Sequence, residues 1–129
     1  MQIAGQILNG LEAVHRSGIV HRDLKPGNVF LSDGDGDIFA RLLDFGISYS
    51  LDPESALRRG RFGTEDRLVV GTPEFMAPEQ AEGRPDVDAR ADVYSVAVIL
   101  YEALSGTLPY TAEHPGQVLF KVIRWECVP

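Results

Sequence analysis

Two short motifs constrain the fold most: His21-Arg22-Asp23-Leu24-Lys25-Pro26-Gly27-Asn28 and, beginning sixteen residues after Asn28, Asp44-Phe45-Gly46. They contain a carboxylate that can act as a base, an ammonium group, and amide and carboxylate oxygens of the kind that bind Mg²⁺. The segments 29–31 and 40–43, apolar except for Arg41, flank a run of turn-forming residues at 32–37, which predicts a β-hairpin between the motifs. Such a hairpin brings residues 28 and 44 together at one edge, so the fold must place all these groups close in space.

This combination suits phosphoryl transfer to a hydroxyl group. The transition state spreads negative charge over the transferred oxygens, so catalysis consists mostly of positioning and charge neutralisation. Asp23 can orient the attacking hydroxyl and accept its proton, while Lys25 can neutralise the moving phosphoryl group and help keep Asp23 ionised. Asn28 and Asp44 can bind Mg²⁺ that bridges the phosphates. An ordinary solvated loop is the alternative, but the order and spacing of both motifs favour a site.

With Gly71-Thr72-Pro73-Glu74-Phe75-Met76-Ala77-Pro78-Glu79, these motifs resemble the C-terminal lobe of a serine/threonine protein kinase. The resemblance covers about residues 2–123, and the compact spacing is similar to that of bacterial receptor-type kinases. It implies a mainly α fold with short β-hairpins, the partial C-terminal lobe of the protein-kinase-like α+β fold, with the N-terminal lobe absent. Residues 1–129 would then form one partial kinase domain with catalytic loop, metal-binding triad, activation segment and central buried helix. ATP and Mg²⁺ are the implied cofactors, and proteins with Ser or Thr hydroxyls are the implied substrates.

The resemblance also implies roles for residues outside the first motif. Lys25 together with Thr72 is typical of kinases that act on Ser or Thr, and the Thr72 hydroxyl is expected near Asp23 and Lys25. Asp92 is expected to accept main-chain N–H bonds from the catalytic loop. An ordinary acidic residue in the first turn of a helix is the alternative for Asp92.

The histidines are expected to be structural rather than catalytic. Histidine side chains in general titrate near neutrality, which suggests the role of base for His21, but the resemblance implies that it packs against Phe45. Gly46 frees the backbone to turn just after the metal ligand. His15 and His114 are interpreted as isolated residues that are structural or merely exposed.

Regulation is a further expectation from the resemblance. Arg22, which precedes the catalytic Asp, is the family's mark for control by phosphorylation of the activation segment. A phosphate on Thr64, or alternatively on Ser55 or Thr72, would pair with Arg22 and order that segment. Glu79 belongs to the substrate-docking end of the segment, and its arginine partner in the family is expected beyond Pro129.

Helical spacing of apolar residues and terminal signals predict the remaining elements. Helices are expected at residues 2–16, 77–82, 88–106 and 117–123. Gly18 ends the first, Gly83 closes the second, and Asp88 and Gly106 bound the third. The third is apolar nearly all round, which predicts burial on most sides. Residues 47–75 hold little periodic signal, which is typical of functional or disordered segments.

Composition excludes several classes of protein. A net charge of −7 argues against nucleic-acid or anionic-lipid partners. The longest apolar run, at 96–100, is too short to cross a bilayer. Cys127 is the only cysteine, which excludes an internal disulfide and favours a cytoplasmic location, although a full-length protein could carry a membrane anchor elsewhere.

Two alternatives stay open. No Gly-rich loop, strand Lys or helical Glu of the family's N-terminal lobe precedes His21. We therefore expect the isolated chain to be inactive. The alternative function is a catalytically dead kinase remnant that acts as a protein-interaction module. The intact metal ligands count against it. Asp33, Asp35 and Asp37 also alternate like an EF-hand calcium loop with Asp44 at its twelfth position, but Ile38 stands where that loop needs Gly.

Overall fold

The computed structural model describes residues 2–34, 36–44 and 71–127. Phe45, Gly46, Ser55 and Thr64 lie outside the described residues, so the expectations for them stay predictions. The described elements, in chain order, are α1 (Gln2–Arg16), η1 (Pro26–Asn28), β1 (Val29–Gly34), β2 (Asp37–Leu42), η4 (Pro73–Phe75), α2 (Pro78–Ala81), α3 (Ala89–Ser105) and α4 (Pro115–Arg124). All four predicted helices are therefore present, together with the hairpin.

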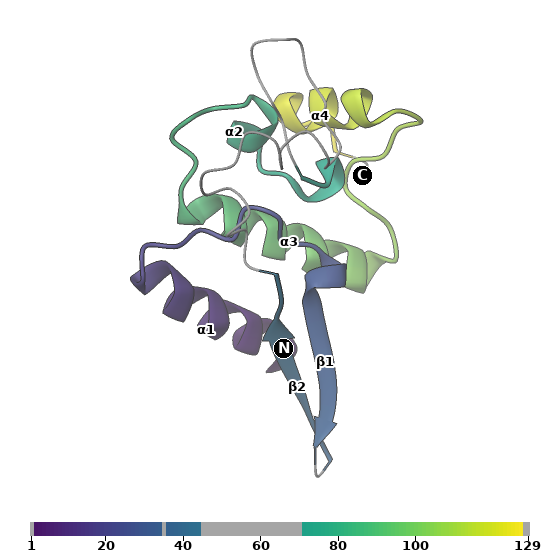
Figure 1. The fold of residues 1–129 in the computed structure, drawn as a ribbon. Coiled ribbons are helices and arrows are strands. Elements are labelled where there is room, and N and C mark those ends of the chain that lie inside the picture. The colour runs from purple at the N-terminus through teal and green to yellow at the C-terminus, as the bar shows by residue number, and fades with distance from the viewer. Residues whose placement is uncertain (1, 35, 45–70, 128–129) are drawn as a thin grey trace.

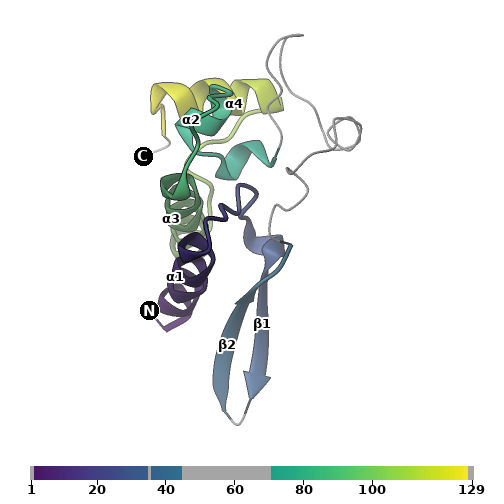
Figure 2. The ribbon, with the colours of Figure 1, turned by 60° about the vertical axis from the view of Figure 1, so that its left-hand side comes forward.

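The strands form an antiparallel pair that runs from Val29 opposite Leu42 to Gly34 opposite Asp37. The expected turn over 32–37 was too long, because main-chain pairing continues through its polar residues. Leu43 in turn lies beyond β2. In both views the hairpin projects away from the helices (Figures 1 and 2).

Helix α1 packs beside β2 and is joined to it by a side chain. The Gln6 amide nitrogen donates to the main-chain oxygen of Ile38 at 3.0 Å, and its oxygen accepts from the Ala40 N–H at 2.6 Å. The Gln6 amide thus bonds the open edge of β2 as a neighbouring strand would. This fixes the direction in which the hairpin leaves the body.

Helix α3 runs between α1 and the α2–α4 pair (Figure 1). Its predicted ends are confirmed: the Asp88 side chain accepts from the Arg90 N–H at 2.9 Å, and Gly106 ends it with φ of 75°. Both are the usual means by which a helix satisfies its terminal main-chain groups.

The expectation that α3 is buried on most sides is wrong for this chain. Val96 and Ile99 are buried, but Val93 is 51% exposed and Leu104 is 89% exposed. Within the described residues, α1 and η4 cover one side of α3, and the apolar residues on its other side face outward. The apolar residues on all sides of α3 therefore predict more burial than the helix has.

The buried apolar side chains of the described residues form two clusters. The first joins α1, the loop after it, η4 and α3, and is formed by Ile7, Leu11, Leu24, Phe75, Val96, Val98 and Ile99. The second joins the α2 and α4 region and is formed by Met76, Ala81, Tyr110, Val118, Leu119 and Val122. Residues 21–28 cross the junction of α1 and α3, with Leu24 as their anchor in the first cluster. Of the helices described, none has the length and apolarity to span a membrane.

Candidate active site

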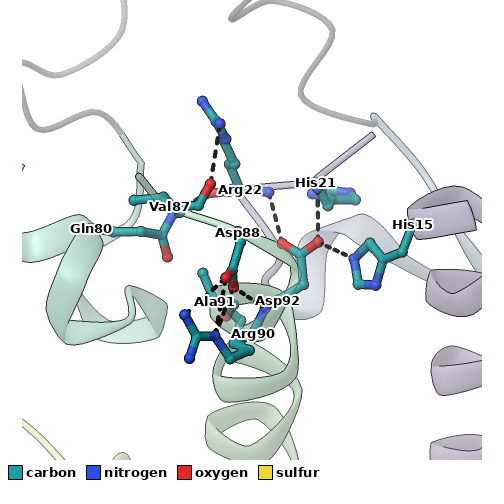
Figure 3. Close-up of polar contacts among 10 residues, drawn as sticks. His15, His21, Arg22, Gln80, Val87, Asp88, Arg90, Ala91 and Asp92 are labelled. Atoms are coloured by element: carbon teal, nitrogen blue, oxygen red, sulfur yellow. Dashed lines mark hydrogen bonds and ion pairs between the residues drawn. The ribbon is translucent and has the colours of Figure 1, made fainter. Parts of the chain in front are cut away.

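The loop at residues 21–28 is fastened to α3 by the carboxylate of Asp92. The main-chain N–H of His21 donates to Asp92 Oδ2 and that of Arg22 donates to Oδ1, each at 2.8 Å (Figure 3). Asp92 is fully buried, so these bonds offset the cost of removing its charge from water. The hydrogen bonds that the resemblance implies are thus present, and the carboxylate points to the loop rather than to solvent.

His15 is a third donor to the same carboxylate, which the sequence did not indicate. Its Nε2 lies 2.7 Å from Asp92 Oδ2, and the two residues are 77 positions apart (Figure 3). The interpretation of His15 as isolated is therefore wrong, because the last turn of α1 meets the first turn of α3. A contact over this separation leaves no local sequence signal. His114, in contrast, is exposed where α4 begins.

His21 is a buried structural residue. Its side chain is fully buried, and Nε2 is 3.0 Å from the main-chain oxygen of Leu43. This contact joins the loop to the end of the hairpin and keeps the ring away from solvent. A buried ring in this position is poorly placed to act as a general base.

Asp23, Lys25 and Thr72 come together at the surface. Lys25 Nζ donates to Asp23 Oδ2 at 3.1 Å and to Thr72 Oγ1 at 3.2 Å. The side chains of Lys25 and Asp23 are 35% and 31% exposed, so a ligand has access to both. Gly71 approaches the same carboxylate: its φ is 137°, and a Cβ there would lie 3.6 Å from Asp23 Oδ1. Two groups from distant segments, the Asp23 carboxylate and the Thr72 hydroxyl, thus contact one ammonium group.

Asn28 links this cluster to the hairpin. Its Nδ2 donates to the main-chain oxygen of Asp23 at 2.7 Å, which leaves Oδ1 as an acceptor. The Leu43 N–H donates to the main-chain oxygen of Asn28 at 2.9 Å. Asp44 follows Leu43 directly, at the same end of the hairpin as Asn28, and is exposed. An amide and a carboxylate oxygen are hard ligands of the type Mg²⁺ prefers, with further ligands supplied by phosphate and water.

The calcium alternative finds no support. No cluster of three or more His, Cys, Asp or Glu side chains able to hold a metal occurs among the described residues, which exclude Asp35. The flanks of the acidic run are the strands β1 and β2, whereas an EF-hand loop joins two helices. A polar hairpin end is the better description.

Gln80, which the sequence did not single out, connects α2 to the loop. Its Nε2 donates to the main-chain oxygen of Arg22 at 2.8 Å, and its Oε1 accepts from the Ala77 N–H at 3.0 Å. The Arg22 side chain donates to the main-chain oxygen of Val87 at 3.3 Å (Figure 3). Glu79 lies next to Gln80 in α2, so the Ala-Pro-Glu motif sits directly beside the loop.

Two exposed ion pairs, Arg84–Asp86 and Arg90–Asp88, lie near the start of α3. Hydrogen bonds from the Arg90 guanidinium hold the pKa of Asp88 below its usual range, and the Arg84 guanidinium lowers the pKa of Asp86 in the same way. Both pairs are in solvent and therefore contribute little to stability. Further along α3, burial raises the pKa of the Tyr94 phenol.

Comparison with known proteins agrees with this geometry. The family described as "Protein kinase domain" matches residues 1–126. Serine/threonine-protein kinase pkn2 of Myxococcus xanthus is 46% identical over 114 residues, which are 88% of this chain and 13% of that protein. Serine/threonine-protein kinase PknB of Mycobacterium tuberculosis is 34% identical over 129 residues, which are the whole chain and 19% of that protein.

A buried carboxylate holds the loop at residues 21–28, and this loop carries a carboxylate and an ammonium group within hydrogen-bond distance of each other. The chain belongs to the protein kinase domain family, within the serine/threonine protein kinases. It spans less than a fifth of the length of these relatives.

Proposed function

We propose that residues 1–129 form the catalytic-loop lobe of a serine/threonine protein kinase, which transfers the γ-phosphate of ATP to Ser or Thr hydroxyls of proteins within a full-length kinase domain. The observation that carries this proposal is the convergence of Asp23 and Thr72 on the Lys25 ammonium group, at 3.1 and 3.2 Å. Kinase chemistry needs a base and a cation this close.

Each residue has a distinct task in this proposal. The Asp23 carboxylate orients the substrate hydroxyl and accepts its proton as the oxygen attacks. Lys25 neutralises charge on the phosphoryl oxygens. Thr72 holds the Lys25 ammonium group beside Asp23. Asn28 Oδ1 and the Asp44 carboxylate would hold Mg²⁺, which when bound to ATP neutralises the phosphates.

The proposal extends to regulation and partners. Phosphate on Thr64 would pair with Arg22 and order the activation segment, while Glu79 supports its docking end. Mass spectrometry of an active full-length protein that found no phosphate between residues 47 and 75 would remove this part. The other proposed partner is the lobe that supplies the Gly-rich loop and strand Lys, and the proposed location is the cytoplasm.

A non-catalytic interaction module is the second candidate. It is favoured by exposed apolar side chains on the hairpin, among them Phe30 at 51% and Ile38 at 48%, because such surfaces mark protein contacts. The same exposure is expected for a kinase lobe that packs against its other lobe. A measurement of kinase activity therefore has to distinguish the two candidate functions.

A segment exchange tests the proposal. The matching 114-residue segment of M. xanthus pkn2 would be replaced by the corresponding residues of this chain, and transfer of labelled γ-phosphate to protein Ser and Thr would be measured. We expect the chimera to be active and its Asp23→Asn variant to lose roughly 10²–10⁴-fold in rate. A chimera that unfolds cooperatively yet transfers no phosphate would support the remnant instead.

A further inference from the structure

We propose that Gln80 is a positioning residue that joins the acceptor-docking segment, residues 72–77, to the loop that carries Asp23. Its Nε2 donates to the main-chain oxygen of Arg22 at 2.8 Å, and its Oε1 accepts from the Ala77 N–H at 3.0 Å. The inference rests on the proposed function, because phosphoryl transfer to a protein requires an acceptor hydroxyl aligned with the base. Gln80 touches none of the reacting groups and acts through the main chain on either side.

The docking segment is fastened to the loop at both of its ends. At its start, the Thr72 hydroxyl accepts from Lys25 Nζ at 3.2 Å. At its end, the Gln80 amide bonds the loop. Asp23 lies on the loop between these two attachment points. One attachment would leave the segment free to pivot, whereas two fix its direction as well as its distance from the base.

The attachment through Gln80 is the one that persists while phosphate is bound. Lys25 is 35% exposed and also donates to Asp23 Oδ2. In the proposed function Lys25 turns to the phosphoryl oxygens, which weakens its bond to Thr72. The Gln80 bond joins a neutral amide to a main-chain oxygen in a partly buried position, and neither group has a task in the transfer.

The segment between the two attachments is held firmly enough to transmit a displacement. Phe75, Met76 and Ala77 are buried. The Phe75 N–H donates to the Thr72 oxygen at 3.0 Å, and the Gln80 N–H donates to the Ala77 oxygen at 2.9 Å. Close packing and these bonds leave little freedom inside the segment, so loss of the attachment at one end changes the alignment of the whole.

The alternative is that Gln80 only caps α2. It is the third residue of this helix, where Gln or Glu often accepts the N–H that precedes the helix. Gln80→Glu separates the roles, because an ionised carboxylate accepts from the Ala77 N–H but has no donor for the Arg22 oxygen. Gln80→Met has similar length and removes both bonds. Gln117 is the third residue of α4 and is exposed, so Gln117→Glu and Gln117→Met are matched controls.

NMR on the full 129-residue chain measures the two bonds separately. The reporters are the carbonyl ¹³C resonance of Arg22, which moves when its oxygen loses a hydrogen bond, and hydrogen exchange of the Ala77 amide. In Gln80→Glu we expect the Arg22 resonance to move and Ala77 to exchange at the parent rate. In Gln80→Met we expect both to change, with Ala77 exchange roughly tenfold faster. The amides of 96–100 in α3, and both Gln117 variants, should match the parent.

Kinetics of the segment-exchange chimera measure the consequence for transfer. We expect both Gln80 variants to lower kcat/KM for an acceptor protein roughly tenfold, the effect of one lost hydrogen bond. The KM for ATP should be unchanged, because the bond aligns the acceptor and not the nucleotide.

Each other outcome overturns the inference. An unmoved Arg22 resonance in Gln80→Glu would show that the donor bond is not made, and parent-level transfer in that variant would show that Gln80 serves α2 alone. A matching rise in the KM for ATP, or faster exchange at 96–100, would show a merely structural role. An inactive parent chimera is a separate result: it would remove the kinase proposal and leave the NMR comparison to decide whether Gln80 holds the loop.

Discussion

Arg22 and Asp44 have φ angles of 65° and 51° although neither is glycine. A left-handed backbone costs an L residue about 1–2 kcal/mol, and Asp tolerates it better than Arg because its short side chain bonds to nearby main chain. Arg22 instead has its N–H bonded to Asp92 and its oxygen bonded to Gln80. Strain is therefore held in place at the residue before Asp23, as is common at functional sites.

Asp92→Asn tests the anchor directly. The substitution replaces one acceptor oxygen with an amide group that has to face an N–H donor, in a position with no access to water. We expect the free energy of unfolding to fall by about 3 kcal/mol, measured by urea denaturation followed by circular dichroism. Asp88→Asn is the matched control in the same helix and should keep the parent stability, because Asn caps helices as well as Asp does. Equal effects of the two substitutions would contradict the assignment of Asp92.

Tyr94 gives a prediction about pH. Burial of its phenol, together with the neighbouring Tyr110, raises its pKa. A raised pKa in the folded state means that the contribution to stability is complete below the unfolded value, about 10, and is lost as pH rises above it. We therefore expect Tyr94→Phe to match the parent at pH 7 and to be up to about 1 kcal/mol more stable at pH 11, discounted for the part of the ring that is exposed.

Urea denaturation at pH 7 and pH 11 measures this difference. Tyr101→Phe, at an exposed position of α3, is the control for removing a hydroxyl. A gain at pH 11 that both variants share, or no gain for Tyr94→Phe, would contradict the assignment of the effect to burial of Tyr94.

At the scale of elements, α3 is tied to η4 by a buried serine. Ser95 Oγ donates to the main-chain oxygen of Phe75 at 2.7 Å and also lies 3.1 Å from that of Ala91. Ser95→Ala would leave the Phe75 oxygen buried without this donor, and we expect a loss of about 1–2 kcal/mol in unfolding free energy. Ser105 makes the same bond to the residue four positions earlier, but in solvent. Ser105→Ala should therefore change stability by less than about 0.5 kcal/mol, and an equal loss in both variants would show that the link to η4 contributes nothing.

The ends of the elements could be predicted from sequence, whereas the contacts between them could not. Asp88, Gly106 and Gly18 act through their own main-chain surroundings, and those signals are local. The bond between His15 and Asp92 and the pairing of Gln6 with β2 depend on where helices meet after folding. The prediction that α3 is buried on most sides failed for a related reason. An apolar residue in a sequence shows only that the residue can be buried, not that another element covers it.

The candidate site likewise combines features that the sequence predicted with contacts that only the folded structure shows. The motif around Asp23 predicted which groups would converge, because its chemistry requires them together, and Lys25 does contact both Asp23 and Thr72. The residues that hold the loop in place could not be identified from the sequence. Gln80 and His15 are common residue types in ordinary helices, and only the assembled fold shows that each has a bonding partner in or beside the loop.

For the molecule as a whole, the side chains of Lys25 and Asp23 at the proposed site are 35% and 31% exposed. The hairpin that carries Asn28 and Asp44 projects from the helices (Figure 2), and its apolar side chains are exposed. The 129 residues contain no Gly-rich loop and no strand Lys before His21 to hold the phosphates of ATP. Phosphoryl transfer by positioning depends on holding both the donor and the acceptor.

We therefore expect residues 1–129 on their own to show no phosphoryl transfer above that of their Asp23→Asn variant. The assay is incorporation of labelled γ-phosphate from MgATP into an acceptor protein, with the active segment-exchange chimera as the positive control. The Asp23→Asn substitution removes the base and keeps the shape, so it fixes the background. ATP-dependent transfer that disappears in Asp23→Asn would contradict this expectation and would mean that the ligands around Lys25 suffice to hold the nucleotide.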